Sequence, residues 1–427
     1  MKVLIKNGHL LDPSQNHDGD FDLLLEDGRV AEVAPGGKIK AKADENFDAR
    51  GLIVAPGFID LHVHLREPGQ SYKETIATGT RAAAAGGFTS VCPMPNTSPI
   101  NDSPAITRWM QDAERGAQVN VFPIAAATVG SLGQQLTDFA ALKRAGAVAV
   151  TDDGKPILGD EIMQLALTAA AQLTLPVIQH AEDTRMTRDA SMNSGATAFR
   201  LGLRGWPGEA EWSIVARDIR LAAETKGHLH VAHLSTAVGL DAVRKAKAAG
   251  AHVTCEVTPH HFTLLDEDVT DYNANFKMNP PLRSREDRDA LLAGMADGTV
   301  DCVATDHAPH AHHEKNAEFD RAPFGITGLE TALGLCISVL HVQHKIPLRR
   351  IVELLTTNPA KIFGLEGRGT LTRGAHADVT IFDPAKKWTF RAADSLSKSK
   401  NSPFDGRRLQ GKVVATIVGG KVARCLQ

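Results

Sequence analysis

The middle of the chain, from about residue 55 to residue 365, alternates short apolar runs with helical patterns, and this alternation constrains the fold most strongly. The strand candidates are 58–64, 89–94, 119–125, 147–151, 176–180, 228–233, 252–257 and 301–305. Helical patterns between them include 73–85, 160–172, 209–226, 237–249 and 285–296. Strand–helix alternation indicates a parallel sheet. Eight repeats over about 300 residues favour a closed (β/α)8 barrel of the TIM type over an open, doubly wound sheet.

Two local signals add to this pattern. No G-x-G-x-x-G or Walker sequence follows the first strand, which argues against a nucleotide-binding α/β fold. Ser284 with Asp287, and Thr327 with Glu330, have the spacing of capping boxes and predict two helix starts.

The two ends of the chain differ from the middle and resemble each other. Their short apolar runs, broken by Gly, Asp and Pro, are 3–5, 21–25, 30–33, 377–382, 388–390 and 413–418. Glu26-Asp27-Gly28 lies between two of these runs and is a hairpin signal. We therefore predict that residues 1–54 and 366–427 form a small β-sandwich domain, and that residues 55–365 form the barrel.

Composition disfavours nucleic-acid-binding, membrane-spanning and disulfide-bonded secreted proteins. The 427 residues carry 47 basic and 50 acidic side chains, a formal charge of −3, and nucleic-acid binders usually have a basic excess. No run of 18 apolar residues predicts a transmembrane helix, and the apolar stretch at the start is too short for a signal peptide. The 5 scattered cysteines include no C-x-x-C pair, which is typical of reduced thiols in the cytoplasm.

Histidine and aspartate side chains occupy the carboxyl ends of the predicted strands, where barrel enzymes carry their active sites. These residues are His62, His64, Asp152, Asp153, His180, His233 and Asp306. Imidazole and carboxylate ligands suit zinc. Asp152 and Asp153 are adjacent and face opposite ways on an extended strand, so only one of them can join the site. The remaining four histidines and two aspartates are too many for one tetrahedral ion, so we predict two ions that share one carboxylate.

Most other histidines have a simpler interpretation. A single histidine at a strand end is usually a hydrogen-bonded structural or surface residue. We therefore interpret His228 and His230, within the sixth strand, and His260 and His261, after the seventh, as structural. The pair 312–313 lies in a polar segment and is expected to be solvated.

Two segments resemble signatures of one enzyme family. They are Asp60-x-His62-x-His64-x-Arg66-x-Pro68-Gly69 and Ala304-Thr305-Asp306-x-Ala308-Pro309-His310, with Lys315 five residues on. The chain resembles dihydroorotases of the amidohydrolase superfamily, of the long-chain bacterial type, over nearly its whole length. The resemblance implies a zinc-dependent, reversible conversion of N-carbamoyl-L-aspartate to (S)-dihydroorotate, the third step of de novo pyrimidine (UMP) biosynthesis. It also implies a barrel with a split β domain.

The position after the fourth strand separates this chain from other members of the superfamily. Many relatives, including hydantoinases, place a carboxylated lysine there as the bridge between the metals. Here the segment is Thr151-Asp152-Asp153-Gly154, which resembles the long-chain dihydroorotases with Asp153 as the bridge. Lys155 is the alternative, but it lies beyond the glycine and is expected to be solvated. This difference favours a dihydroorotase over a hydantoinase, allantoinase or imidase.

The resemblance also implies roles for individual residues. One zinc would be held by His62, His64 and Asp306, the other by His180 and His233, and both by Asp153 and a hydroxide. Asp306 would also act as general base and then general acid. The implied substrate-binding residues are His64, Arg66, Asn96, Asn279, His310, Phe324 and Gly325. The alternative for Arg66 is a structural ion pair with Glu67 or Asp60.

Three alternatives remain open from the sequence. The first is another cyclic-amide hydrolase of the hydantoinase or allantoinase kind. The second is an inactive dihydroorotase-like partner of aspartate carbamoyltransferase; such proteins have lost metal ligands, whereas all six are present here. The third is a nucleic-acid-binding barrel, which the charge disfavours. The expected partners are the small-molecule substrate, a second copy in a homodimer and aspartate carbamoyltransferase, with no nucleic acid and no membrane.

Overall fold

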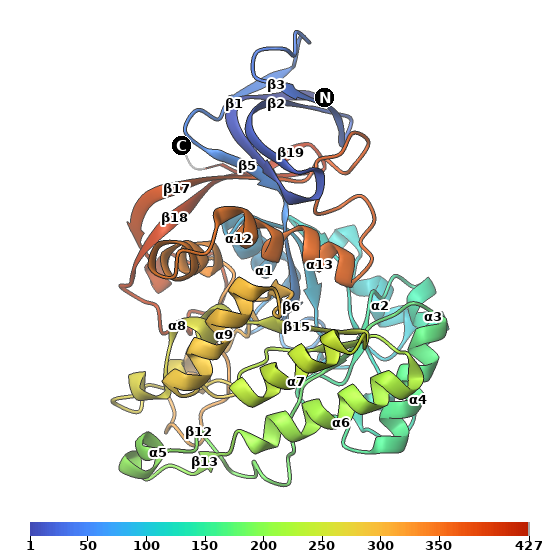
Figure 1. Ribbon diagram of the computed structural model, residues 1–427, viewed down its shortest axis with the longest axis vertical. Helices are drawn as coiled ribbons and strands as arrows, with labels where there is room; N and C mark the ends of the chain where they lie inside the picture. Colours follow the sequence, from blue (N-terminus) through green and yellow to red (C-terminus); the bar gives the residue numbers. More distant parts are fainter. Residues whose placement is uncertain (426–427) are drawn as a thin grey trace.

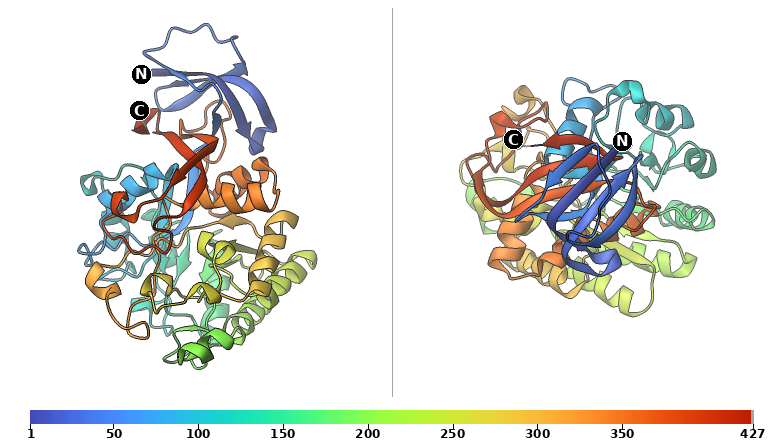
Figure 2. Two further views of the ribbon diagram at one scale, coloured as in Figure 1. Left: turned by 90° about the vertical axis from the view of Figure 1, so that its left-hand side faces the viewer. Right: turned by 90° about the horizontal axis from the view of Figure 1, so that it is seen from above.

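The computed structural model describes residues 1–425, which form a barrel and a sheet stacked along the long axis (Figure 1). The barrel is built from the middle of the chain. The sheet lies at one end of the barrel and combines the first and the last strands of the described chain (Figure 2).

The barrel strands follow the predicted order. They are β6 (Phe58–Val63), β7 (Phe88–Pro93), β8 (Asn120–Val121), β9 (Ala125–Ala126), β10 (Val150–Thr151), β11 (Val177–Gln179), β14 (Leu229–Val231), β15 (Val253–Val257) and β16 (Cys302–Val303). The pairs β6-β7-β8 and β9-β10-β11-β14-β15-β16 are all parallel. A parallel bridge between Val63 and His307 joins the last strand to the first, which closes the barrel.

The third predicted strand, 119–125, is divided into β8 and β9. Pro123 lies in the gap, and proline has no N–H group to donate to a neighbouring strand. The chain nevertheless continues along β7, because Phe122 N donates to Val91 O (3.0 Å) and Ile124 N donates to Pro93 O (3.0 Å). The eight-strand prediction is therefore confirmed, with one strand interrupted.

Helices follow the strands around the outside. They are α1 (Ile76–Ala85), α2 (Pro104–Met110), α3 (Phe139–Arg144), α4 (Asp160–Gln172), α6 (Glu209–Thr225), α7 (Ala237–Ala248), α9 (Arg285–Asp297), α11 (Ala332–Leu335), the π-helix η6 (Cys336–Gln343), α12 (Leu348–Leu355) and α13 (Thr357–Ile362). Three further short helices of the described chain, α5 (Ala196–Leu201), α8 (Pro259–Thr263) and α10 (His312–Lys315), lie in loops. Among the described residues, no helix combines the length and the hydropathy needed to cross a membrane.

One of the two predicted helix starts is correct. Ser284 accepts a hydrogen bond from Asp287 N and caps α9. The capping box predicted at Thr327 and Glu330 is wrong, because α11 begins at Ala332. Glu330 instead accepts from Leu396 N at 3.1 Å, so its carboxylate is used to hold a segment that is distant in sequence.

The terminal sheet contains eight strands. They are β1 (Lys2–Asp12), β2 (His17–Glu26), β3 (Arg29–Pro35), β4 (Glu45–Asp48), β5 (Ile53–Pro56), β17 (Val379–Thr389), β18 (Arg408–Val418) and β19 (Lys421–Cys425). The order is β19-β18-β17-β5-β1-β2-β3, with β4 beside β1. Asp27 (φ 49°) and Gly28 (φ 76°) form the predicted hairpin turn. An antiparallel bridge from Arg29 to His376 brings β3 back towards β17, so the sheet curls around a core of its own, much as a sandwich does.

Two connections of the chain show how the carboxyl ends of the barrel strands lie relative to the terminal sheet. Strand β6 starts two residues after β5 ends at Pro56, so its first residues lie next to the terminal sheet and its last residues point away from it. Between β17 and β18 the chain returns to the barrel through residues 395–402, which we call the crossover segment. This segment reaches the carboxyl ends of the strands, because Asn401 Nδ2 donates to Gly325 O (3.0 Å) and Lys398 N donates to Glu74 Oε1 (3.1 Å).

Candidate active site

All six predicted metal ligands lie together at the carboxyl ends of the strands, and all six are buried. Asp306 Oδ1 is 3.4 Å from His62 Nε2 and 2.9 Å from His64 Nε2. Asp153 Oδ1 is 3.5 Å from both His62 Nε2 and His180 Nδ1, and 4.0 Å from His233 Nε2. Asp153 therefore lies between the two groups of ligands.

The backbone at two of these residues adopts a strained conformation. His233 has φ 30° and Asp306 has φ 45°, backbone angles that residues other than glycine rarely adopt. Such strain costs about 1–3 kcal/mol per residue and is concentrated at functional sites. In this barrel it occurs at the ends of the sixth and eighth strands, where it directs both side chains into the cluster.

Two unpartnered atoms test whether a metal fits. His62 Nε2 and Asp153 Oδ1 are buried and have no hydrogen-bond partner. A buried polar atom without a partner is costly, and a cation between these two atoms would satisfy both. Three overlapping groups of ligand atoms each lie within 4.8 Å: His62–His64–Asp153, His62–His233–Asp306 and Asp153–His180–His233. The imidazole and carboxylate donors are those of zinc and similar divalent ions, so the residues fit the implied metal.

The charges of the cluster also favour a cation. Burial acts to lower the pKa of His62, but the carboxylates of Asp306, Glu256 and Asp153 outweigh it and raise this pKa to about 10. Burial acts to raise the pKa of Asp153, but His62 and the other imidazoles hold it well below its ordinary value. The cluster therefore holds ionised carboxylates beside a protonated imidazole, and a metal ion would take the place of that proton, because imidazole binds a metal only in its neutral form.

Residues behind the cluster orient its imidazoles. Glu256 on β15 accepts from His62 Nδ1 (2.7 Å) and from His230 Nε2 (3.1 Å). Asn96 Oδ1 accepts from His64 Nδ1 (3.0 Å), so Nε2 of each imidazole faces the other ligands. A carboxylate or carbonyl behind a ligating histidine fixes its tautomer and raises its basicity. His230 keeps the structural role expected for it, as a partner of Glu256.

Glu256 was not predicted as a site residue. The available signal was its position in a buried strand between Cys255 and Val257, where a charge needs a partner. Glu256, His230 and Cys302 also form a candidate ligand group. Burial raises the pKa of Cys302 well above its ordinary value, so a metal would have to displace the thiol proton to bind there.

Asp152 and Asp153 differ in their surroundings, as adjacent residues on an extended strand should. Asp152 Oδ1 accepts from Thr128 N at 2.9 Å, and its other oxygen accepts from the Thr128 hydroxyl. Asp152 is therefore used to hold the loop after β9. Lys155 is exposed, as expected, and contributes nothing to the cluster.

Two buried cations, Arg66 and Lys73, contact His310 near the cluster. Arg66, which is 8% exposed, donates from Nε to Pro309 O (3.1 Å), and its Nη2 lies 3.2 Å from His310 Nε2. The alternative ion pairs are not formed, because Asp60 accepts from Thr305 N (3.0 Å) and Glu67 accepts from Ile76 N (2.8 Å). Arg66 is thus directed towards Pro309 and His310 and not towards either carboxylate.

The remaining predicted substrate residues lie near His310 or near Glu182, whose carboxylate contacts His180 of the cluster. Gly325 has φ 153°, and a Cβ there would lie 2.6 Å from Ala308 O, so this close approach requires glycine. Phe324 is partly exposed and lies against Lys277 Nζ, 4.5 Å from the ring centre. Asn279 Nδ2 donates to Glu182 Oε2 (3.1 Å), while its Oδ1 is buried without a partner and is free to accept.

Two residues near the site were not predicted to belong to it. Asn401, in the crossover segment, accepts from His310 N (2.9 Å) and donates to Ala308 O (3.0 Å) and Gly325 O (3.0 Å). His260 is buried with Nε2 unpartnered, and burial with the neighbouring His261 lowers its pKa well below its ordinary value. Its position after β15 was known from the sequence, but a single histidine there gave no reason to prefer a functional role.

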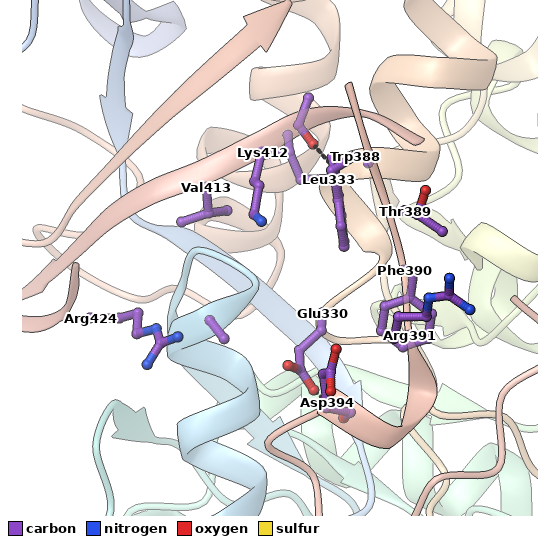
Figure 3. A pocket seen from close by; sticks show the side chains of 14 residues that line it. Glu330, Leu333, Trp388, Thr389, Phe390, Arg391, Asp394, Lys412, Val413 and Arg424 are labelled. Carbon is purple, nitrogen blue, oxygen red and sulfur yellow. Dashed lines mark hydrogen bonds between the residues drawn. The ribbon is translucent and has the colours of Figure 1, made fainter. Parts of the chain in front are cut away.

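A separate pocket lies at the junction of the barrel and the terminal sheet (Figure 3). It has a volume of about 180 Å³ and is lined by residues that include Glu330, Trp388, Arg391 and Lys412. Its lining residues include no ligand of the cluster and neither Arg66 nor His310. The candidate active site is therefore the cluster at the carboxyl ends of the strands.

Relatives and solved structures match this chain over nearly its whole length. A family model described as dihydro-orotase-like matches residues 51–238. A dihydroorotase of Solibacter usitatus is 50% identical over 421 residues, which cover 98% of this chain and 97% of the relative. A dihydroorotase of Endomicrobium trichonymphae is 49% identical over 423 residues, 99% of each chain. Among solved structures, an L-hydantoinase (dihydropyrimidinase) from Arthrobacter aurescens aligns with a TM-score of 0.88 at 25% identity, over 98% of this chain and 95% of that one.

Proposed function

The chain belongs to the dihydroorotase family, and we propose that it catalyses the reversible, zinc-dependent cyclisation of N-carbamoyl-L-aspartate to (S)-dihydroorotate and water, the third step of pyrimidine biosynthesis. The observation that carries the proposal is that two kinds of chemistry lie side by side at the carboxyl ends of the strands. A six-residue ligand cluster lies beside a buried arginine that makes no ion pair with Asp60 or Glu67. The ligand cluster suits hydrolysis of an amide, and the arginine suits a substrate that carries a carboxylate.

The ligand cluster would hold two zinc ions. His62, His64 and Asp306 would bind one ion, His180 and His233 the other, and Asp153 both, which accords with its position between the two groups. Bound zinc acts as a Lewis acid and lowers the pKa of water to about 7. Asp306 would take a proton from the attacking water and give it to the ring nitrogen that leaves. In the cyclisation direction the same carboxylate would take the proton from that nitrogen and give it to the hydroxide, which leaves as water.

The test is an assay in both directions on the metal-loaded protein. We expect N-carbamoyl-aspartate to give the absorbance of dihydroorotate, a chelator to abolish the reaction, and added zinc to restore it. Hydantoin and allantoin are the matched controls for another cyclic-amide hydrolase. Turnover of hydantoin without turnover of dihydroorotate would favour that alternative, and no metal binding at all would favour an inactive structural partner.

Replacement of Arg66 tests the assignment of the substrate carboxylate. A guanidinium can grip a carboxylate with two parallel hydrogen bonds, whereas lysine keeps the charge and loses this geometry. We expect Arg66→Lys to lower kcat/KM for both substrates by about tenfold or more, since a hydrogen bond to a charged group contributes about 1.5–3 kcal/mol. Zinc content should stay unchanged. Near-normal kcat/KM in Arg66→Ala would place the carboxylate elsewhere.

We further propose that the enzyme is a cytoplasmic homodimer that can associate with aspartate carbamoyltransferase. The thiols of Cys92, Cys255, Cys302 and Cys336 are buried and form no disulfides, which accords with a reducing compartment. Light scattering on the protein alone, and mixed with aspartate carbamoyltransferase, measures both associations. A monomeric mass in each case would contradict them.

A further inference from the structure

His310 lies between two cations, and this arrangement is chemically incomplete. Lys73 Nζ is 3.3 Å from His310 Nδ1, and Arg66 Nη2 is 3.2 Å from His310 Nε2. Lysine and arginine only donate hydrogen bonds, and a neutral imidazole has one nitrogen that accepts and one that donates. Only one of the two contacts can therefore be a hydrogen bond. The other places two donors side by side.

Lys73 is fixed by contacts of both its side chain and its backbone. It is 8% exposed, and its Nζ donates to Glu314 Oε1 at 3.0 Å. Its backbone is fixed as well, because its N–H donates to Gln70 O (2.9 Å) and its C=O accepts from Ser399 Oγ in the crossover segment (2.6 Å). The ammonium group is thus held against one side of the imidazole.

The other tautomer has no good acceptor. With its proton on Nδ1, His310 would have to donate to Glu314 Oε2, which is 3.6 Å away and beyond normal hydrogen-bonding distance. The ring is also kept neutral. Burial, with the charges of Arg66, Lys73 and Lys315, lowers the pKa of His310 far below its ordinary value.

We propose that Lys73 is a positioning residue for substrate recognition. By donating to His310 Nδ1 it holds the imidazole in the Nε2–H form, so that His310 and Arg66 together donate to the substrate carboxylate. The proposal rests on the proposed function and adds a residue to its specificity. It explains why two donors meet without an acceptor: a carboxylate has two oxygens, and it can accept from both.

The kinetic test compares Lys73→Met, which removes the charge and the donor, with Lys73→Arg, which keeps both. Orotate carries the ring carboxylate and uracil lacks it, so the inhibition constants of these two compounds isolate recognition of that group. We expect Lys73→Met to weaken inhibition by orotate about tenfold, equal to about 1.4 kcal/mol. Inhibition by uracil and the metal content should stay unchanged, and KM should rise more than kcat falls.

The control variant is Lys398→Met. Lys398 is an exposed lysine whose Nζ donates to Ser71 O (2.6 Å), and its side chain does not contact His310. It should behave as the wild type, and Lys73→Arg should retain most of the affinity for orotate. An equal loss of affinity for orotate and uracil in Lys73→Met, or no loss for either, would overturn the proposal.

The tautomer can also be measured directly and without substrate. In ¹⁵N-histidine-labelled protein, with His310 assigned by comparison with His310→Gln, we expect Nδ1 to give the signal of an unprotonated nitrogen. Lys73→Met should move that signal to Nε2. A wild-type His310 with its proton on Nδ1 would refute the role of Lys73 even if the enzyme is a dihydroorotase. Absence of turnover in the wild type would refute the proposed function, and the tautomer measurement would still decide the role of Lys73.

Discussion

Asp306→Asn is expected to reduce turnover by at least about 10²–10⁴-fold, the usual contribution of general acid–base catalysis. The asparagine keeps the shape of the side chain but cannot take up a proton. It also removes a negative charge that lies 2.9 Å from His64 Nε2 and 3.4 Å from His62 Nε2. The loss should be equal in the two reaction directions, because the same carboxylate carries the proton both ways. Initial rates from N-carbamoyl-aspartate and from dihydroorotate measure it.

Asp241→Asn is a suitable control for Asp306→Asn. Asp241 lies on the surface of α7 and pairs with Lys245 (2.7 Å) and Arg244 (3.7 Å) on the same helix. It should leave both rates unchanged. Metal content measured on the same samples separates loss of the base from loss of an ion. A variant of Asp306 with normal rates would exclude the proposed proton transfer.

Asp153→Asn is expected to abolish turnover and to lower the zinc content. Asp153 Oδ1 is buried, has no hydrogen-bond partner and lies 3.5 Å from one imidazole of each ligand group. An amide in its place has one weak acceptor oxygen and no charge, so it cannot serve as a shared ligand for two cations. Zinc per protein chain, measured by elemental analysis after exhaustive dialysis, gives the result.

The neighbouring residue supplies the matched control. Asp152→Asn should retain both metals, because the Asp152 carboxylate is used by Thr128 and not by the cluster. It should lower the free energy of unfolding by about 1 kcal/mol, the usual contribution of a hydrogen bond. Equal loss of metal in the two variants, or loss only in Asp152→Asn, would reverse the assignment of the bridge.

The barrel could be predicted because its signal is local. Alternating buried strands and helices indicate a parallel sheet wherever they occur, and the eight-strand prediction is confirmed although β8 and β9 are separated at Pro123. The capping box predicted at Thr327 was wrong, because the same residue types are used there in tertiary contacts. Thr327 N donates to Asn401 O (3.0 Å) and Glu330 accepts from Leu396 N (3.1 Å).

The candidate ligands could be predicted for a geometric reason. In a closed parallel barrel the carboxyl ends of all strands meet at one rim, so a residue's place at the end of its strand is enough to bring it near the others. His62, His180 and Asp306 are far apart in the chain and lie in one cluster for this reason. Their binding of zinc stays a prediction.

The sequence by itself therefore determined the fold class, the rim that bears the site and the residue types gathered there, because periodicity and strand ends are local properties. Only the tertiary structure decided which side chains support that rim. Glu256 meets His62 across the barrel (2.7 Å), and Asn401 returns after the barrel is complete to hold His310 (2.9 Å). Such pairs depend on the path of the whole chain and on how its parts pack, and no local spacing of residues encodes them.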